Sequence, residues 1–67
     1  MDYVEWGRGY LEEAKVLKER IAPLNRELKT ADRETAPLLY RRIAILEDMY
    51  LECLHTGRYL VERGENG

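Results

Sequence analysis

The apolar residues of this chain form two long runs with the alternating four- and three-residue spacing of a helix packed along another helix. The first run comprises Tyr3, Gly7, Tyr10, Ala14, Leu17, Ile21, Leu24, Leu28 and Ala31. The second comprises Leu39, Ile43, Leu46, Tyr50, Cys53, Gly57 and Leu60. This pattern predicts an all-α fold, an antiparallel two-helix hairpin, in which the two runs form one coiled-coil-like seam.

A turn is predicted between the two runs. The segment 30–36, TADRETA, is polar and precedes Pro37, and the residue before a proline disfavours helical geometry. Thr35 is the expected N-cap of the second helix, and Gly64 its expected end. We therefore expect a single helical-hairpin domain over residues 1–67, with one helix over about 3–29, a turn over 30–36 and a second helix over about 37–63.

Three residues weaken the first helix locally. Gly7 and Gly9 each cost a helix up to ~1 kcal/mol relative to alanine, so they weaken its first two turns. Pro23 removes a backbone donor, but at about 100° per residue it lies nearly opposite the seam. A bend there would curve the helix around its partner, so we expect one continuous helix.

Laying the two runs antiparallel gives one consistent register. Leu28 then faces Leu39, and Leu17 faces Tyr50. Toward the open end large residues meet small ones, as dense packing requires, and Gly57 makes room for Tyr10. The alternative interpretation is that Gly57 loosens the helix, so that its neighbours form an exposed recognition patch: His55, Arg58 and Tyr59.

Apolar residues remain after the seam is filled, and they recur at helical spacing on both sides of it. A hairpin has only one seam, so this surplus predicts a homodimer in which two hairpins form a four-helix bundle. A helix of another protein in the same groove, or a simple scatter of exposed aliphatic side chains, are the alternatives. The candidate partner interface comprises Val4, Leu11, Val16, Leu38, Ile45, Met49, Leu51, Leu54 and Val61.

Composition limits which partners and which cellular compartment are expected for this chain. The 67 residues carry a formal net charge of −2, which gives no global attraction to nucleic acid or to an anionic membrane. Cys53 is the only cysteine, which excludes an intramolecular disulfide and favours a reducing, cytoplasmic setting. No stretch approaches the ~20 apolar residues that span a bilayer, so no membrane partner is expected.

Basic residues gather near the predicted turn. We interpret them as a solvated helix end, because acidic residues are interspersed among them. The alternative is a contact with phosphate, which would make the chain a small nucleic-acid-associated or regulatory accessory protein. This candidate basic patch comprises Arg26, Lys29, Arg33, Arg41 and Arg42.

The side chains that carry catalytic chemistry are few. Cys53 and His55 are two residues apart, which turns them by about 200° on a helix and separates a thiol from its base. Glu52 and His55 have the Glu-x-x-His spacing of a di-iron site, but both lie away from the seam. We therefore expect no enzyme, no catalytic or metal-binding residue and no cofactor; a metal enzyme assembled across a dimer is the alternative.

Two segments carry a resemblance to other proteins. YLEEAKVLKERIAPLNRELK and RRIAILEDMYLECLHTGRYL together resemble short helical-hairpin proteins of Gram-positive bacteria, some of them associated with mobile elements. The resemblance covers nearly the whole chain and implies a bacterial helical hairpin. It implies no activity and assigns no site residue, so the sequence predicts a non-enzymatic interaction module.

Overall fold

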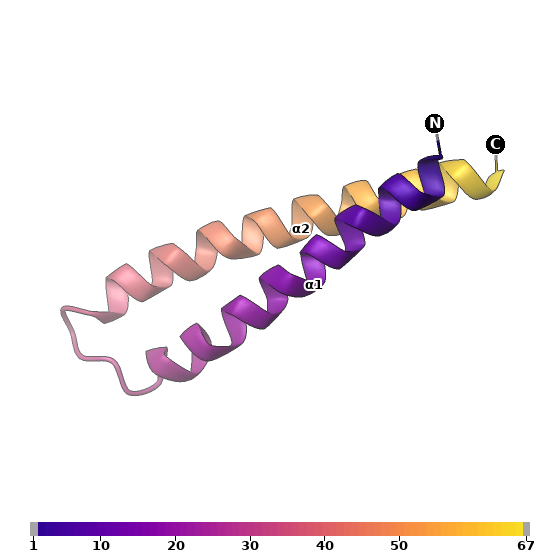
Figure 1. Cartoon of the computed structure of the whole chain (residues 1–67). Coiled ribbons are helices and arrows are strands. Elements are labelled where there is room, and N and C mark those ends of the chain that lie inside the picture. Colours follow the sequence, from indigo (N-terminus) through magenta and orange to yellow (C-terminus); the bar gives the residue numbers. More distant parts are fainter. Residues whose placement is uncertain (1, 67) are drawn as a thin grey trace.

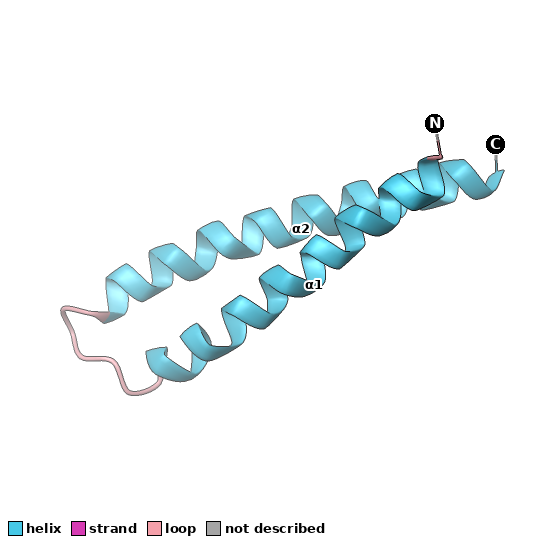
Figure 2. Ribbon diagram, in the orientation of Figure 1, coloured by secondary structure: helices cyan, strands magenta, loops and turns pink. Residues whose placement is uncertain are grey.

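The computed structural model describes residues 2–66 and contains, within that range, two helices and no strand. Helix α1 spans Tyr3–Leu28, helix α2 spans Ala36–Asn66, and residues 29–35 connect them (Figures 1 and 2). The two termini lie together at one end of the molecule, here called the open end, and the turn lies at the other (Figure 1). The predicted all-α antiparallel hairpin is thus confirmed.

Helix α1 is continuous from its first turn to its last. The Asp2 carboxylate accepts a hydrogen bond from the Glu5 N–H at 3.2 Å and caps the N-terminus. Pro23 is exposed, so its ring does not interrupt the packed face, and the helix passes through it to Leu28. One carboxylate cap and an outward-facing proline thus allow 26 residues to stay helical.

The turn is organised by Asp32. Its Oδ1 atom accepts hydrogen bonds from the Glu34 N–H at 3.1 Å and the Thr35 N–H at 2.7 Å, while its carbonyl accepts from the Ala36 N–H at 2.9 Å. Thr35 directly precedes α2, and its carbonyl oxygen accepts from the N–H groups of Leu38 and Leu39. Thr35 therefore occupies the predicted N-cap position, and the Asp32 carboxylate holds the turn in front of it.

The expectation that α2 ends before Gly64 is wrong. The helix continues to Asn66. Gly64 lies against α1, where a Cβ atom would stand 2.6 Å from Val4 Cγ2 and 2.8 Å from the Val4 backbone nitrogen. The glycine is therefore a point of close helix contact, and this packing overrides its local tendency to stop a helix.

The core is the predicted seam and little else. Its buried apolar residues are Ala14, Leu17, Ile21, Leu39, Ile43 and Leu60, and the seam glycines Gly7 and Gly57 are buried with them. Leu17, at 1% exposure, is the best covered. The other seam residues of the two helices are half-buried, except the exposed Tyr3: Tyr10, Leu24, Leu28, Leu46, Tyr50 and Cys53.

The molecule is a rod. Its extents are 51 × 14 × 14 Å and its radius of gyration is 15.4 Å, against about 11 Å for a compact domain of this length. Two helices side by side bury only the faces that touch each other. The remaining faces of both helices are therefore open to solvent along the whole rod.

The helices approach most closely at the open end and diverge toward the turn (Figure 1). Near the open end a Cβ atom on Gly7 would lie 2.8 Å from Val61 Cγ2, and one on Gly57 would lie 2.8 Å from Leu11 Cδ2. Neither glycine has a positive φ, so the missing Cβ, and not backbone freedom, is what this crossing uses. Toward the turn, larger side chains such as Ile43 occupy the seam and hold the helices apart.

Candidate functional site

Large apolar side chains remain exposed along the rod. Leu38 is 66% exposed, Ile45 55%, Met49 47% and Trp6 45%. The others in residues 2–66 are Tyr3, Tyr40, Leu51 and Tyr59. Single exposed apolar residues are ordinary on a monomer, but a contiguous patch marks a contact surface.

Four residues of α2 form one line. Leu38, Ile45, Met49 and Cys53 follow each other at steps of seven, four and four residues, which places them on one face of the helix. Cys53 is half-buried and lines a shallow depression together with residues of α1: Trp6, Gly9, Tyr10 and Glu13. The line therefore crosses from α2 onto α1.

Aromatic side chains continue the line on α1. The Tyr3 and Trp6 rings are stacked with their centroids 6.2 Å apart, and the Trp6 and Tyr10 centroids are 6.4 Å apart. We call the whole surface the apolar stripe, and it comprises Leu38, Ile45, Met49 and Cys53 of α2 with Tyr10, Trp6 and Tyr3 of α1. Tryptophan, tyrosine and methionine are the side chains enriched in protein interfaces.

Arg63 fixes the aromatic end of the stripe. Its Nη1 atom donates a hydrogen bond to the Tyr59 hydroxyl at 3.2 Å, and its guanidinium carbon lies 5.4 Å from the centroid of the Tyr3 ring. The hydrogen bond with Tyr59 raises the pKa of Arg63 above its ordinary value. A cation over the ring of Tyr3 holds that ring in place without covering its neighbour Trp6.

The structure divides the predicted partner interface into two groups. Leu38, Ile45, Met49 and Leu51 are exposed. The others, Val4, Leu11, Val16, Leu54 and Val61, are half-buried, and of these Val4, Leu11 and Val61 pack against the glycines of the opposite helix. Those three side chains are therefore used within the hairpin.

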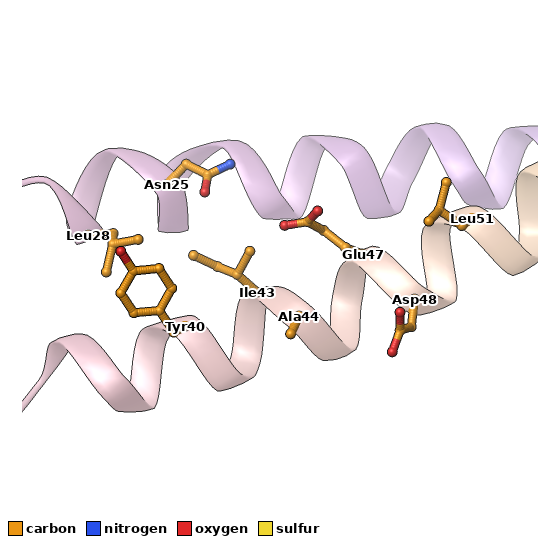
Figure 3. A pocket seen from close by; sticks show the side chains of 8 residues that line it. All are labelled: Asn25, Leu28, Tyr40, Ile43, Ala44, Glu47, Asp48 and Leu51. Carbon is orange, nitrogen blue, oxygen red and sulfur yellow. The ribbon is translucent and has the colours of Figure 1, made fainter.

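Leu51 lies on the opposite side of the hairpin from Met49, since two residues turn a helix by about 200°. There it lines a groove with residues from both helices: Asn25, Leu28, Tyr40, Ile43, Ala44, Glu47 and Asp48. Figure 3 shows Ile43 and Glu47 pointing toward α1, with Leu28 beside the Tyr40 ring. We call this surface the polar groove, because carboxylate and amide groups interrupt its apolar lining.

The basic patch lies at the turn end. Arg26 is in the last turn of α1, and Arg33 is in the connection between the helices. All five side chains of the basic patch are exposed. Between them lies Asp32, whose pKa is lowered, first by the hydrogen bond from the Thr35 N–H. The carboxylate of Asp32 therefore stays ionised and offsets part of the positive charge.

The HTGRYL segment is regular helix, so the idea that Gly57 loosens it is wrong. Gly57 gives room to Leu11 and to the Gly7 carbonyl oxygen, 2.9 Å from where its Cβ would stand, instead of to Tyr10. The crossing is offset from the predicted register by about one residue. His55 and Arg58 are exposed, and the Tyr59 hydroxyl is bonded to Arg63.

The side chains considered for catalysis or metal binding do not lie together in one site. Cys53 is half-buried in the apolar stripe, while His55 and Glu52 are exposed on α2. No group of three or more His, Cys, Asp or Glu side chains is arranged to hold a metal ion in residues 2–66. Among the described residues, neither helix is long and apolar enough to span a bilayer.

Sequence reasoning placed Tyr3 in the seam and Tyr59 in a recognition patch, and it missed Trp6 and Arg63 at the aromatic end of the apolar stripe. The signal was present, because Tyr3, Trp6 and Tyr10 are spaced three and four residues apart.

Comparisons with family models, with curated proteins and with solved structures find no match to this chain. The exposed surface of the hairpin is therefore the basis for a proposed function.

Proposed function

We propose that the chain is a non-enzymatic, self-associating helical interaction module, in which two hairpins pack into a four-helix bundle. The observation that carries this proposal is the area of exposed surface. The molecule exposes 5441 Å², whereas a compact monomer of its mass, 7.9 kDa, exposes about 4,400 Å². The excess of about 1,000 Å² is similar to the ~800 Å² that each partner buries in a standard interface.

The composition of the exposed surface supports the same proposal. The apolar stripe presents leucine, isoleucine, methionine and tryptophan side chains that are each close to half exposed or more. Only six apolar residues of the described chain are buried, which is a small core for a domain that must offset its own ordering entropy. A second hairpin on the stripe would supply the missing core.

Trp6 provides a direct probe, because it is the only tryptophan and it lies in the stripe. If hairpins associate through this surface, its emission maximum shifts to shorter wavelength as the protein concentration rises from micromolar to millimolar. An emission maximum that stays at the wavelength of exposed tryptophan over this whole range would contradict the proposal. Leu51→Lys, on the opposite side, is the control variant and should shift as the wild type does.

The alternative function is a nucleic-acid-associated accessory protein that uses the basic patch. It is supported by the exposure of all five basic side chains at one end of the rod. It predicts retention on DNA that weakens steeply with salt concentration. A chain that does not bind DNA at low salt would eliminate this alternative and leave the interaction module standing.

A further inference from the structure

We infer that the occupant of the apolar stripe is a second copy of this chain laid antiparallel to the first, turn end against open end; this rests on the self-association proposed above. The pairs that meet at the glycine crossing, Gly7 with Val61 and Gly57 with Leu11, have residue numbers that sum to 68. Each α1 residue can therefore be assigned the α2 residue number that lies beside it, which is its level along the rod. On that scale Trp6 lies level with residue 62, Tyr10 with 58 and Tyr3 with 65.

The apolar stripe is self-complementary when it is inverted about its midpoint. The stripe runs from Leu38 to the level of residue 65, so its midpoint lies between Met49 and Cys53. A two-fold axis through that point lays Leu38 on Tyr3 of the partner subunit, and Ile45 on Tyr10 of the partner subunit. Met49 then meets Cys53 of the partner subunit, so at these three levels an aliphatic side chain lies against an aromatic or a small one.

The two ends of the rod carry opposite charge. Residues 26–42, around the turn, hold five basic and three acidic side chains, a net charge of +2. The levels that oppose them, residues 2–7 and 61–66, hold one basic and four acidic side chains, a net charge of −3. An antiparallel pair brings these ends together twice, whereas a parallel pair would place like charge on like charge.

The polar groove is a poorer surface for a second copy. Glu47, Asp48 and Asn25 interrupt it, and burying them without partners would cost free energy. The apolar half-buried residues on that side, such as Leu11, already pack against glycines of the same chain. Of the two sides of the hairpin, the apolar stripe is therefore the better surface for a second copy. The charge of the basic patch would then help to orient the dimer.

Met49 and Leu51 form a matched pair for choosing the side. They are two residues apart in α2, 47% and 45% exposed, and on opposite sides of the seam. Met49→Lys should weaken the dimer by about tenfold or more, and Leu51→Lys should change its dissociation constant by less than about twofold. A loss of affinity in Leu51→Lys with none in Met49→Lys would overturn the inference while leaving self-association intact.

The orientation is tested with a spin label in the turn. One chain carries Arg33→Cys and Cys53→Ala, has a nitroxide attached at residue 33, and contains no ¹⁵N. This chain is mixed with ¹⁵N-labelled wild-type chain, so only the wild-type amides are observed. Broadening of the Gly7, Gly9 and Gly64 amides is expected, because the antiparallel pair places the turn of one chain at the open end of the other.

The possible outcomes of the spin-label experiment are distinct. Broadening confined to residues 29–38 would mean a parallel dimer, which overturns the inference and leaves the proposed function standing. No broadening, together with no concentration-dependent shift of Trp6 emission, would overturn both. The unlabelled Cys53→Ala chain is first checked for the wild-type shift of Trp6 emission, so that loss of the thiol is not mistaken for loss of the contact.

Discussion

The carbonyl oxygen of Gly57 lies 2.7 Å from the point where a Cβ atom on Gly7 would stand. Two helices can approach this closely only where both lack side chains. The obstruction is backbone, which cannot rotate away as a long side chain can. Gly7 and Gly57 therefore set the crossing point of the hairpin, and through it the spacing of the helices toward the turn.

Gly7 and Gly9 are two residues apart in α1 and should respond oppositely to alanine. Gly7→Ala should destabilise the fold by about 1 to 3 kcal/mol, because its Cβ meets the backbone of α2. Gly9→Ala should stabilise it by about 0.5 to 1 kcal/mol, because nothing lies within 4 Å of the new atom and alanine favours the helix. Urea unfolding at one protein concentration measures both, and equal effects would refute the close crossing.

Gly57 and Leu11 should be energetically coupled. The Cβ of Gly57→Ala meets Leu11 Cγ and Cδ2 at 2.8 Å, so shortening Leu11 to alanine should relieve part of the clash. A double-mutant cycle should give an interaction energy of about 0.5 to 3 kcal/mol. Tyr10→Ala is the matched control, and we expect no relief from it. Relief by Tyr10→Ala instead would restore the register predicted from the sequence.

The seam could be predicted from the sequence because it depends only on periodicity. Residues such as Leu17 and Ile43 recur with steps of three and four, and every such residue in the two helices is buried or half-buried except Tyr3. The contacts of Gly57 could not be predicted this way. They depend on how far two backbones approach and rotate once Cβ atoms are absent, which is a property of both helices together.

Gly64 differs from its sequence-based prediction for the same physical reason. Its propensity predicts a helix end, but its contact with Val4 keeps the last turns of α2 in place. Of the interaction surface, spacing alone found the aliphatic residues of α2, including Met49. The spacing of Tyr3, Trp6 and Tyr10 also marks Trp6, but the contacts between their rings form only when the helix forms.

Asp32 should make the turn sensitive to acid. Its pKa is lowered below the ordinary 3.8 in the folded chain, chiefly by the Thr35 N–H. The stabilisation is therefore full above pH 3.8 and lost as the pH falls through the lowered pKa. Asp32→Ala should lower the melting temperature at neutral pH, and the difference from wild type should vanish in strong acid.

Glu34→Ala serves as the control for Asp32, because it removes a carboxylate from the same turn and leaves both hydrogen bonds to Asp32 in place. We expect it to change the melting temperature far less at neutral pH. A carboxyl titration followed by NMR measures the pKa of Asp32 itself. A value at or above 3.8 would contradict the role of Asp32 in holding the turn.

Salt should weaken the dimer if opposite charges meet at its ends. Exposed charges are screened within about 10 Å at 0.1 M ionic strength, so the attraction between the turn end and the open end falls as salt is added. The dissociation constant should therefore rise with sodium chloride concentration. A dimer held by the apolar stripe alone would keep or gain affinity, which would argue against the antiparallel orientation.

The most direct test of the account is sedimentation equilibrium over a wide dilution range, with helicity followed by circular dichroism in the same samples. We expect a species of twice 7.9 kDa that loses helicity as it dissociates, because one seam is a small core for an isolated hairpin. A fully helical monomer at every concentration would contradict it. The apolar stripe would then be open to a different protein.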